Sequence, residues 1–153
     1  MLRTSALVVA TLAIALAGCG SEPKTVTKAQ YEREVQRLGT ELTNAGSELG
    51  RSIDIATFNG NVDKLQDTLH SAADDLHGMK PPANVQGAND QLADALDGFA
   101  DELEQVKEAR RKSIYRARDA LVRVSKSQPV SQARRATRAL KRAGYQTGQF
   151  GSL

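Results

Sequence analysis

The chain has 153 residues, a formal net charge of +3, 4% aromatic residues and no Trp. This length suits one domain with a modest hydrophobic core, and a chain poor in aromatic residues and Pro but rich in Ala, Leu and charged residues is expected to be mostly helical. With a single Cys, two His and none of the motifs of hydrolases, metalloproteases or phosphate-binding loops, we do not expect an enzyme.

Residues 1–18 are predicted to be a secretory signal peptide. A short start containing Arg3 is followed by twelve uncharged residues, Ala6–Ala17. Twelve helical residues rise roughly 18 Å, too little for the ~20 apolar residues that span a bilayer. The pattern therefore predicts a leader that is cleaved rather than a permanent membrane helix.

The leader ends in the motif Leu16, Ala17, Gly18 and Cys19. This motif resembles the lipobox of bacterial lipoprotein precursors. The resemblance implies that signal peptidase II recognises Leu16, Ala17 and Gly18, and that the Cys19 thiol carries a diacylglyceryl group at the mature N-terminus. It also implies a lipid-anchored protein on the outer face of the bacterial cytoplasmic membrane. Two or more acyl chains hold a protein stably there, and apart from this covalent lipid we expect no cofactor.

Residues 19–26 contain a Pro and no apolar periodicity, so we interpret them as a flexible tether. A helix is predicted after Thr27, because Gln30 three residues later completes a capping box. Its apolar residues recur in steps of three and four, as in a coiled-coil heptad. They are Tyr31, Val35, Leu38, Leu42, Ala45 and Leu49. A turn is predicted at residues 58–61.

Two further helices are predicted by the same periodicity. The second has the apolar positions Val62, Leu65, Leu69, Ala72, Leu76 and Met79. It is ended by Pro81 and Pro82. The third runs from about Ala83 to about Val124, since no Gly or Pro lies between Gly98 and Pro129.

We therefore predict an all-α fold. Residues 27–125 are expected to form an elongated antiparallel three-helix bundle, coiled-coil-like, with a long third helix. Residues 126–153 are expected to form a short basic helix capped by Ser131 and a loose tail from Tyr145. A straight third helix would carry the basic residues away from the lipid anchor, whereas a bend at residues 107–113 would bring them back towards it.

A second resemblance covers the junction before the third helix. Its residues are similar to a segment of small helical lipoproteins of actinobacteria, and the similarity implies no catalytic residue. They are Lys80, Pro81, Pro82, Ala83, Val85, Ala88, Gln91, Leu92, Ala95 and Leu96.

Charge is divided unevenly along the chain. Residues 19–106 contain seven Lys and Arg and 16 Asp and Glu, whereas residues 107–153 contain 13 basic and two acidic residues. The basic residues either lie against the acidic helices or form a solvated face, or they contact an anionic cell-envelope polymer, lipid head groups or a protein partner. Nucleic acid is not expected, because no aromatic residue interleaves the basic helix. The residues predicted for an anionic surface are Arg110, Arg111, Lys112, Arg134, Arg135, Arg138, Lys141 and Arg142. Self-association of the oppositely charged halves into a homo-oligomer stays open.

One group of side chains indicates an alternative function. His70, Asp74 and His77 follow one another at spacings of four and three, so they can share a helix face and hold a divalent metal. Histidines at the boundary of an apolar face are also common without a ligand. Our interpretation is a non-catalytic binding or scaffolding lipoprotein, and the alternative is a ligand- or metal-binding lipoprotein with a site near His70 and His77.

Overall fold

The structure, a computed structural model, describes residues 25–52 and 54–152. Throughout these residues the regular structure is helical and no strand occurs, which confirms the predicted all-α class. The α-helices are α1 (Lys28–Gly50), α2 (Ile55–Gly78), α3 (Gln86–Lys112), α4 (Ile114–Val124) and α5 (Gln128–Arg142). Short 3₁₀ segments, η1 (Ala83–Val85) and η2 (Gly148–Ser152), precede α3 and follow α5.

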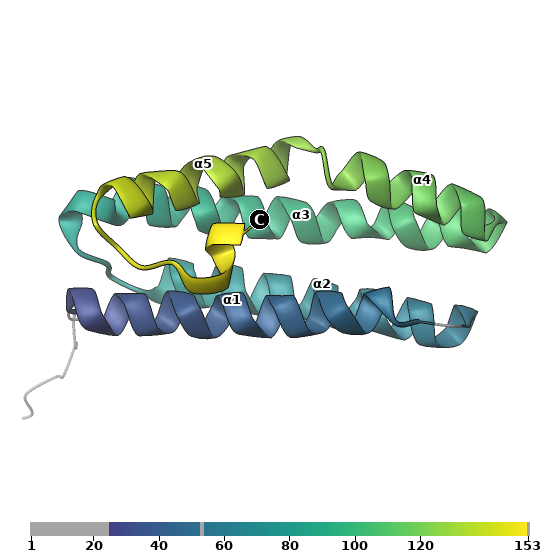
Figure 1. Cartoon of the computed structure of the whole chain (residues 1–153), viewed down its shortest axis with the longest axis horizontal. Helices are drawn as coiled ribbons and strands as arrows, with labels where there is room; N and C mark the ends of the chain where they lie inside the picture. Colours follow the sequence, from purple (N-terminus) through teal and green to yellow (C-terminus); the bar gives the residue numbers. More distant parts are fainter. Residues whose placement is uncertain (1–24, 53, 153) are drawn as a thin grey trace, which may run out of the picture.

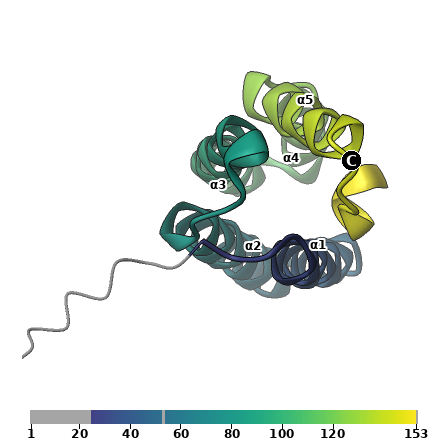
Figure 2. The ribbon, with the colours of Figure 1, turned by 90° about the vertical axis from the view of Figure 1, so that its left-hand side faces the viewer.

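The helices pack in the order of the chain (Figures 1 and 2). α1 lies along α2, α2 along α3, and α4 and α5 together run back along α3 as a fourth layer. The segment after α5 packs against both α1 and α5 and so closes the arrangement. This arrangement differs from the predicted three-helix bundle, because the basic C-terminal part is a full layer of it. None of the described helices is long and apolar enough to cross a membrane.

The start of α1 agrees with the predicted capping box. The Thr27 hydroxyl accepts a hydrogen bond from the Gln30 backbone N–H at 3.3 Å, and the Gln30 side chain accepts one from the Thr27 backbone N–H at 2.8 Å. Tyr31, Val35 and Leu38 are then buried on the inner face, as the periodicity predicts.

The turn between α1 and α2 lies earlier than predicted. α1 ends at Gly50, and Asp54 caps α2 by accepting a hydrogen bond from the Thr57 N–H at 2.8 Å. Phe58, which we predicted in the turn, is consequently a buried residue in the first turns of α2. The short polar side chain of Asp54 determines the boundary, because it satisfies an N–H group that has no partner within the helix.

The predicted straight helix to Val124 is wrong. α3 ends at Lys112, and Ser113 is fully extended with φ −172° and ψ 159°. Its hydroxyl accepts a hydrogen bond from the Arg116 N–H at 3.2 Å and so starts α4 in a new direction. The residues around the break are charged and carry no buried apolar side chain to favour a continuous helix. The chain folds back here so that Ala117, Ala120 and Val124 are buried against α3.

The predicted loose tail is also wrong. Gly144, at φ 82°, allows the Tyr145 N–H to bond to the Leu140 carbonyl at 3.0 Å, which ends α5 in a Schellman motif. The chain then turns back across the bundle, and Tyr145 and Phe150 join the hydrophobic core. The apolar area that these two rings bury explains why the segment is docked.

Candidate functional site

The predicted lipidation site cannot be placed. Leu16, Ala17, Gly18 and Cys19 lie outside the described residues. The last residue of the predicted tether is nevertheless docked, since the Val26 N–H donates to the Lys80 carbonyl at 2.9 Å. The chain therefore enters the folded part at the end of the bundle where α1 begins and α2 ends.

The predicted basic residues form two separate groups. Arg110, Arg111 and Lys112 lie in the last turn of α3, at the end of the bundle away from the start of α1 (Figure 1). Arg135, Arg138 and Arg142 lie with Arg134 and Lys141 on exposed positions of α5. We call these five residues of α5 the α5 basic face.

The C-terminal end of α5 lies beside the beginning of α1. The Lys28 ammonium is 5.1 Å from the centre of the Tyr145 ring. The Gln146 backbone N–H donates to the Glu32 carboxylate at 2.9 Å. The break at Ser113 thus brings the last turn of α5 back to the end at which the chain enters.

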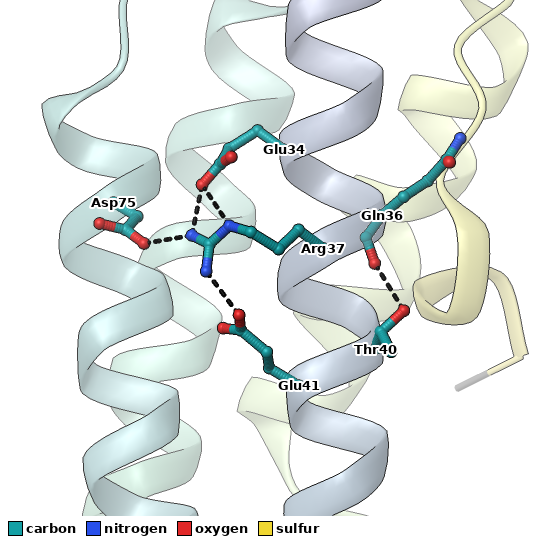
Figure 3. A network of polar contacts seen from close by, with 6 residues as sticks. All are labelled: Glu34, Gln36, Arg37, Thr40, Glu41 and Asp75. Atoms are coloured by element: carbon teal, nitrogen blue, oxygen red, sulfur yellow. Dashed lines mark hydrogen bonds and ion pairs between the residues drawn. The ribbon is translucent and has the colours of Figure 1, made fainter.

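The acidic helices pair their charges among themselves. Arg37 bonds to Glu41 at 2.7 Å and to Asp75 of α2 at 2.6 Å, and it also contacts Glu34 (Figure 3). Hydrogen bonding to these carboxylates, to Glu34 above all, raises the pKa of Arg37. Such pairs fix the register of neighbouring helices, although exposed ion pairs add little stability.

Further ion pairs join α2 to α1 and to α3. Lys64 pairs with Glu48 of α1 at 2.7 Å, and Lys107 of α3 pairs with Asp63 at 2.7 Å. By contrast, Arg134, Arg135, Arg138 and Arg142 form no ion pair with any residue that the structure describes. The acidic helices therefore do not neutralise these four guanidinium groups.

The two histidines do not share a ligand, and each lies beside a different Asp of α3. His70 Nδ1 lies 2.9 Å from Asp97 Oδ1, and His77 Nε2 lies 3.5 Å from Asp94 Oδ1. Asp74 is exposed, and within residues 25–52 and 54–152 no three His, Cys, Asp or Glu side chains are grouped to hold a metal ion. Each histidine thus has its own carboxylate partner at the α2–α3 interface.

The bundle contains an apolar cavity of about 500 Å³, which includes Leu69 beside the predicted ligand site but neither His70 nor His77. Leu65, Leu69, Leu96 and Phe99 line it from α2 and α3. Its side walls are α1, with Leu42, and α5, with Val130. Phe150 also lines it, so the docked tail forms part of the wall.

Small residues from several helices line the cavity and leave room for it. Gly46, Ala95 and Ala133, from three different helices, all line it. The junction between α4 and α5 lies beside the cavity, since Ser125 is also a lining residue. The sequence did contain a signal for this cavity. It has Ala at helix positions where the apolar periodicity would allow a larger apolar residue.

The rim of the cavity is polar. Thr43, Ser47 and Arg134 line it and are solvent-exposed, and Gln149 lies beside them. Arg134 is the charged residue among the lining residues. The arrangement is an apolar interior with a positive charge at its mouth.

Large exposed apolar side chains gather on the far part of the bundle. Tyr115 is 79% exposed and Ile55 56% exposed. They belong to the first turns of α4 and α2, and both helices begin at the end of the bundle away from the start of α1 (Figure 1). Ile114 and Val122 of α4 are about half exposed. This end offers apolar contact area, unlike the end at which the chain enters.

No protein-family model matches the chain, and neither a curated protein nor a solved structure does.

Proposed function

We propose that this protein is a lipid-anchored, non-catalytic binding module on the outer face of the bacterial cytoplasmic membrane. The α5 basic face contacts the anionic surface of the cell envelope. The observation that carries the proposal is the position of α5, whose last turn lies beside Lys28 at the entry of the chain.

The length of the tether supports this orientation. Only six residues lie between Cys19 and Val26, and a chain of seven extended steps reaches roughly 25 Å at most. A lipid on Cys19 would therefore hold the entry end of the bundle near the membrane. Because the break at Ser113 returns α5 to that end, its cationic residues are held near the same surface.

Electrostatics supports the choice of an anionic partner. A Lys or Arg near an anionic lipid surface contributes about 1 kcal/mol, and the attraction falls off within a Debye length of about 8–10 Å. Arg135, Arg138 and Arg142 are exposed and lack carboxylate partners among the described residues. They are thus available for head groups or for an anionic wall polymer.

The test compares two variants of equal charge. One carries Arg135→Gln, Arg138→Gln and Arg142→Gln; the control carries Arg111→Gln, Lys112→Gln and Arg116→Gln at the other end. Both are made in residues 25–153, since the core residues all lie between Tyr31 and Phe150. Co-sedimentation is measured with vesicles of equal parts phosphatidylglycerol and phosphatidylcholine and with purified cell wall, at two salt concentrations.

We expect salt-sensitive binding that the α5 variant loses and the control variant keeps. The surface that retains the wild-type chain identifies the partner as lipid or wall polymer. Equal loss of binding in both variants would show that binding depends on net charge and not on the position of the charges. No binding of the wild type to either surface would contradict the proposal.

The alternative is a lipoprotein that binds a soluble ligand. The cavity favours this alternative, although neither His70 nor His77, beside which the ligand site was predicted, lines it. Ligand binding and surface contact share Arg134 but otherwise use different residues, so both are compatible in one molecule.

A further inference from the structure

We propose that the cavity binds the hydrocarbon chain of a single-chain anionic amphiphile, such as a fatty acid, with the acidic head group at Arg134. The inference goes beyond the surface contact proposed above, because it concerns the interior of the bundle and a different class of ligand.

The size and lining of the cavity indicate an apolar ligand. Its volume of about 500 Å³ lies within the roughly 300–1,000 Å³ that is usual for small-molecule sites. Leu65 and Leu69 of α2 and Leu96 and Phe99 of α3 present hydrocarbon to the space, and no charged residue lies on this floor. A hydrocarbon chain can therefore leave water without any polar group of the protein losing a partner.

The mouth indicates the charge of the head group. Arg134 is exposed at the rim and pairs with no residue that the structure describes. Its planar guanidinium can donate two parallel hydrogen bonds to a carboxylate. Since no Asp or Glu among the residues that the structure describes lines the cavity, the rim attracts an anion and would repel a cationic amphiphile.

The small residues explain how the space is kept open. A Cβ atom added at Gly46 would meet no other heavy atom within 4 Å, so a larger residue could stand there without a clash. A helix-interior Gly costs about 1 kcal/mol relative to Ala. Gly46 is thus unfavourable for the helix, and it leaves the space beside α1 empty.

The first experiment measures the Kd of laurate for residues 25–153 by titration calorimetry, below the critical micelle concentration. Decanoate and myristate give the dependence on chain length. We expect each added methylene to tighten binding roughly fourfold until the cavity is full. A Kd that does not depend on chain length would overturn the proposal.

Blocking the cavity provides the second test. Gly46→Phe should weaken laurate binding at least tenfold. Gly60→Phe is the matched control, because Gly60 is also in a helix with no atom within 4 Å of an added Cβ but does not line the cavity. Both variants must keep the helical circular dichroism of the wild type. If Gly46→Phe binds laurate as the wild type does, the ligand is not in the cavity.

The head group is tested by changing one charge at a time. Arg134→Gln should weaken laurate about tenfold and leave dodecanol unchanged, whereas Arg135→Gln, which does not line the cavity, should affect neither. Lysophosphatidylglycerol of the same chain length distinguishes a phosphate from a carboxylate head group. The ligand with the lower Kd shows which of the two head groups the site prefers. Dodecyltrimethylammonium binding as tightly as laurate would overturn the role of Arg134.

This test is independent of the surface contact. Gly46→Phe leaves the α5 basic face intact, and the triple substitution of Arg135, Arg138 and Arg142 leaves the lining of the cavity intact. Failure of either proposal can therefore be recognised while the other stands.

Discussion

The ring of Tyr145 meets the ring of Tyr31 edge to face, with 5.6 Å between the ring centres and 87° between the ring planes. Tyr31 lies in the second turn of α1 and Tyr145 directly after α5, so this pair joins the two ends of the folded chain. The Tyr145 hydroxyl also donates to the Asn84 side chain at 3.1 Å, which adds the loop before α3 to the same cluster.

Removing the Tyr145 ring should therefore destabilise the fold. Tyr145→Ala leaves a hole beside the buried Tyr31 and removes an aromatic pair, and we expect a loss of about 3–5 kcal/mol in the free energy of unfolding. Urea denaturation followed by circular dichroism measures it. Tyr115→Ala is the control, because Tyr115 is 79% exposed and its loss should cost no more than about 0.5 kcal/mol. Equal effects in both variants would show that the tail is not docked.

Tyr31 should make the protein sensitive to alkaline pH. Burial, with smaller contributions from Tyr145 and Asp90, raises the pKa of Tyr31 in the folded state. The folded protein holds this proton more tightly than the unfolded chain does. The contribution of Tyr31 to the free energy of unfolding is therefore fully present below pH 10 and is lost as the pH rises above it, by up to about 1.4 kcal/mol per pH unit. Tyr31→Phe should remove this slope. Denaturation midpoints between pH 8 and pH 11 provide the comparison, and a slope unchanged in Tyr31→Phe would assign the effect to another group.

The break at Ser113 can be measured as a distance. In a straight helix, spin labels at the exposed residues 91 and 123 would be roughly 48 Å apart. In the structure, Arg123 lines the same surface cleft as Glu104, so α4 runs back beside α3. We expect double electron–electron resonance to give less than two thirds of the straight-helix distance. A distance near 48 Å would restore the continuous third helix.

Gly148 should be intolerant of any side chain. It adopts φ 50°, and an added Cβ would lie 2.9 Å from the Cγ atom of Gln36. Gly148→Ala is therefore expected to lower the free energy of unfolding by about 1–2 kcal/mol. Gly87→Ala, in the first turn of α3 with open space around it, should be neutral or slightly stabilising. Thermal unfolding of the two variants decides the point, and similar melting temperatures would argue against the close contact of the tail with α1.

Local signals in the sequence predicted the first half of the fold well. The capping box at Thr27 and the stop before Pro81 depend on residues within one or two turns, and both agree with the structure. The apolar periodicity of α1 to α3 also identified most of their buried residues. Such features need no knowledge of the rest of the molecule.

The second half depends on contacts between distant residues. Ser113 ends α3 because the return of α4 buries apolar area that a straight helix would leave in water. The docking of Phe150 against Gly39 depends on a space in α1 that the pattern of the tail does not reveal. The cavity could not be located for the same reason, since Gly46, Ala95 and Ala133 come from three helices whose relative positions were unknown.

The docking of Phe150 beside Gly39 also affects the order in which the molecule folds. Contacts between consecutive helices join nearby parts of the chain, whereas these two residues are more than 100 positions apart. Closing so long a loop costs more conformational entropy, so this contact should form after the helix pairs. Segments of a folded protein can open as local units in native fluctuations, at a lower free energy than global unfolding. The wall that Phe150 contributes would then be a gate, opening without global unfolding and giving the interior of the bundle a path to the outside.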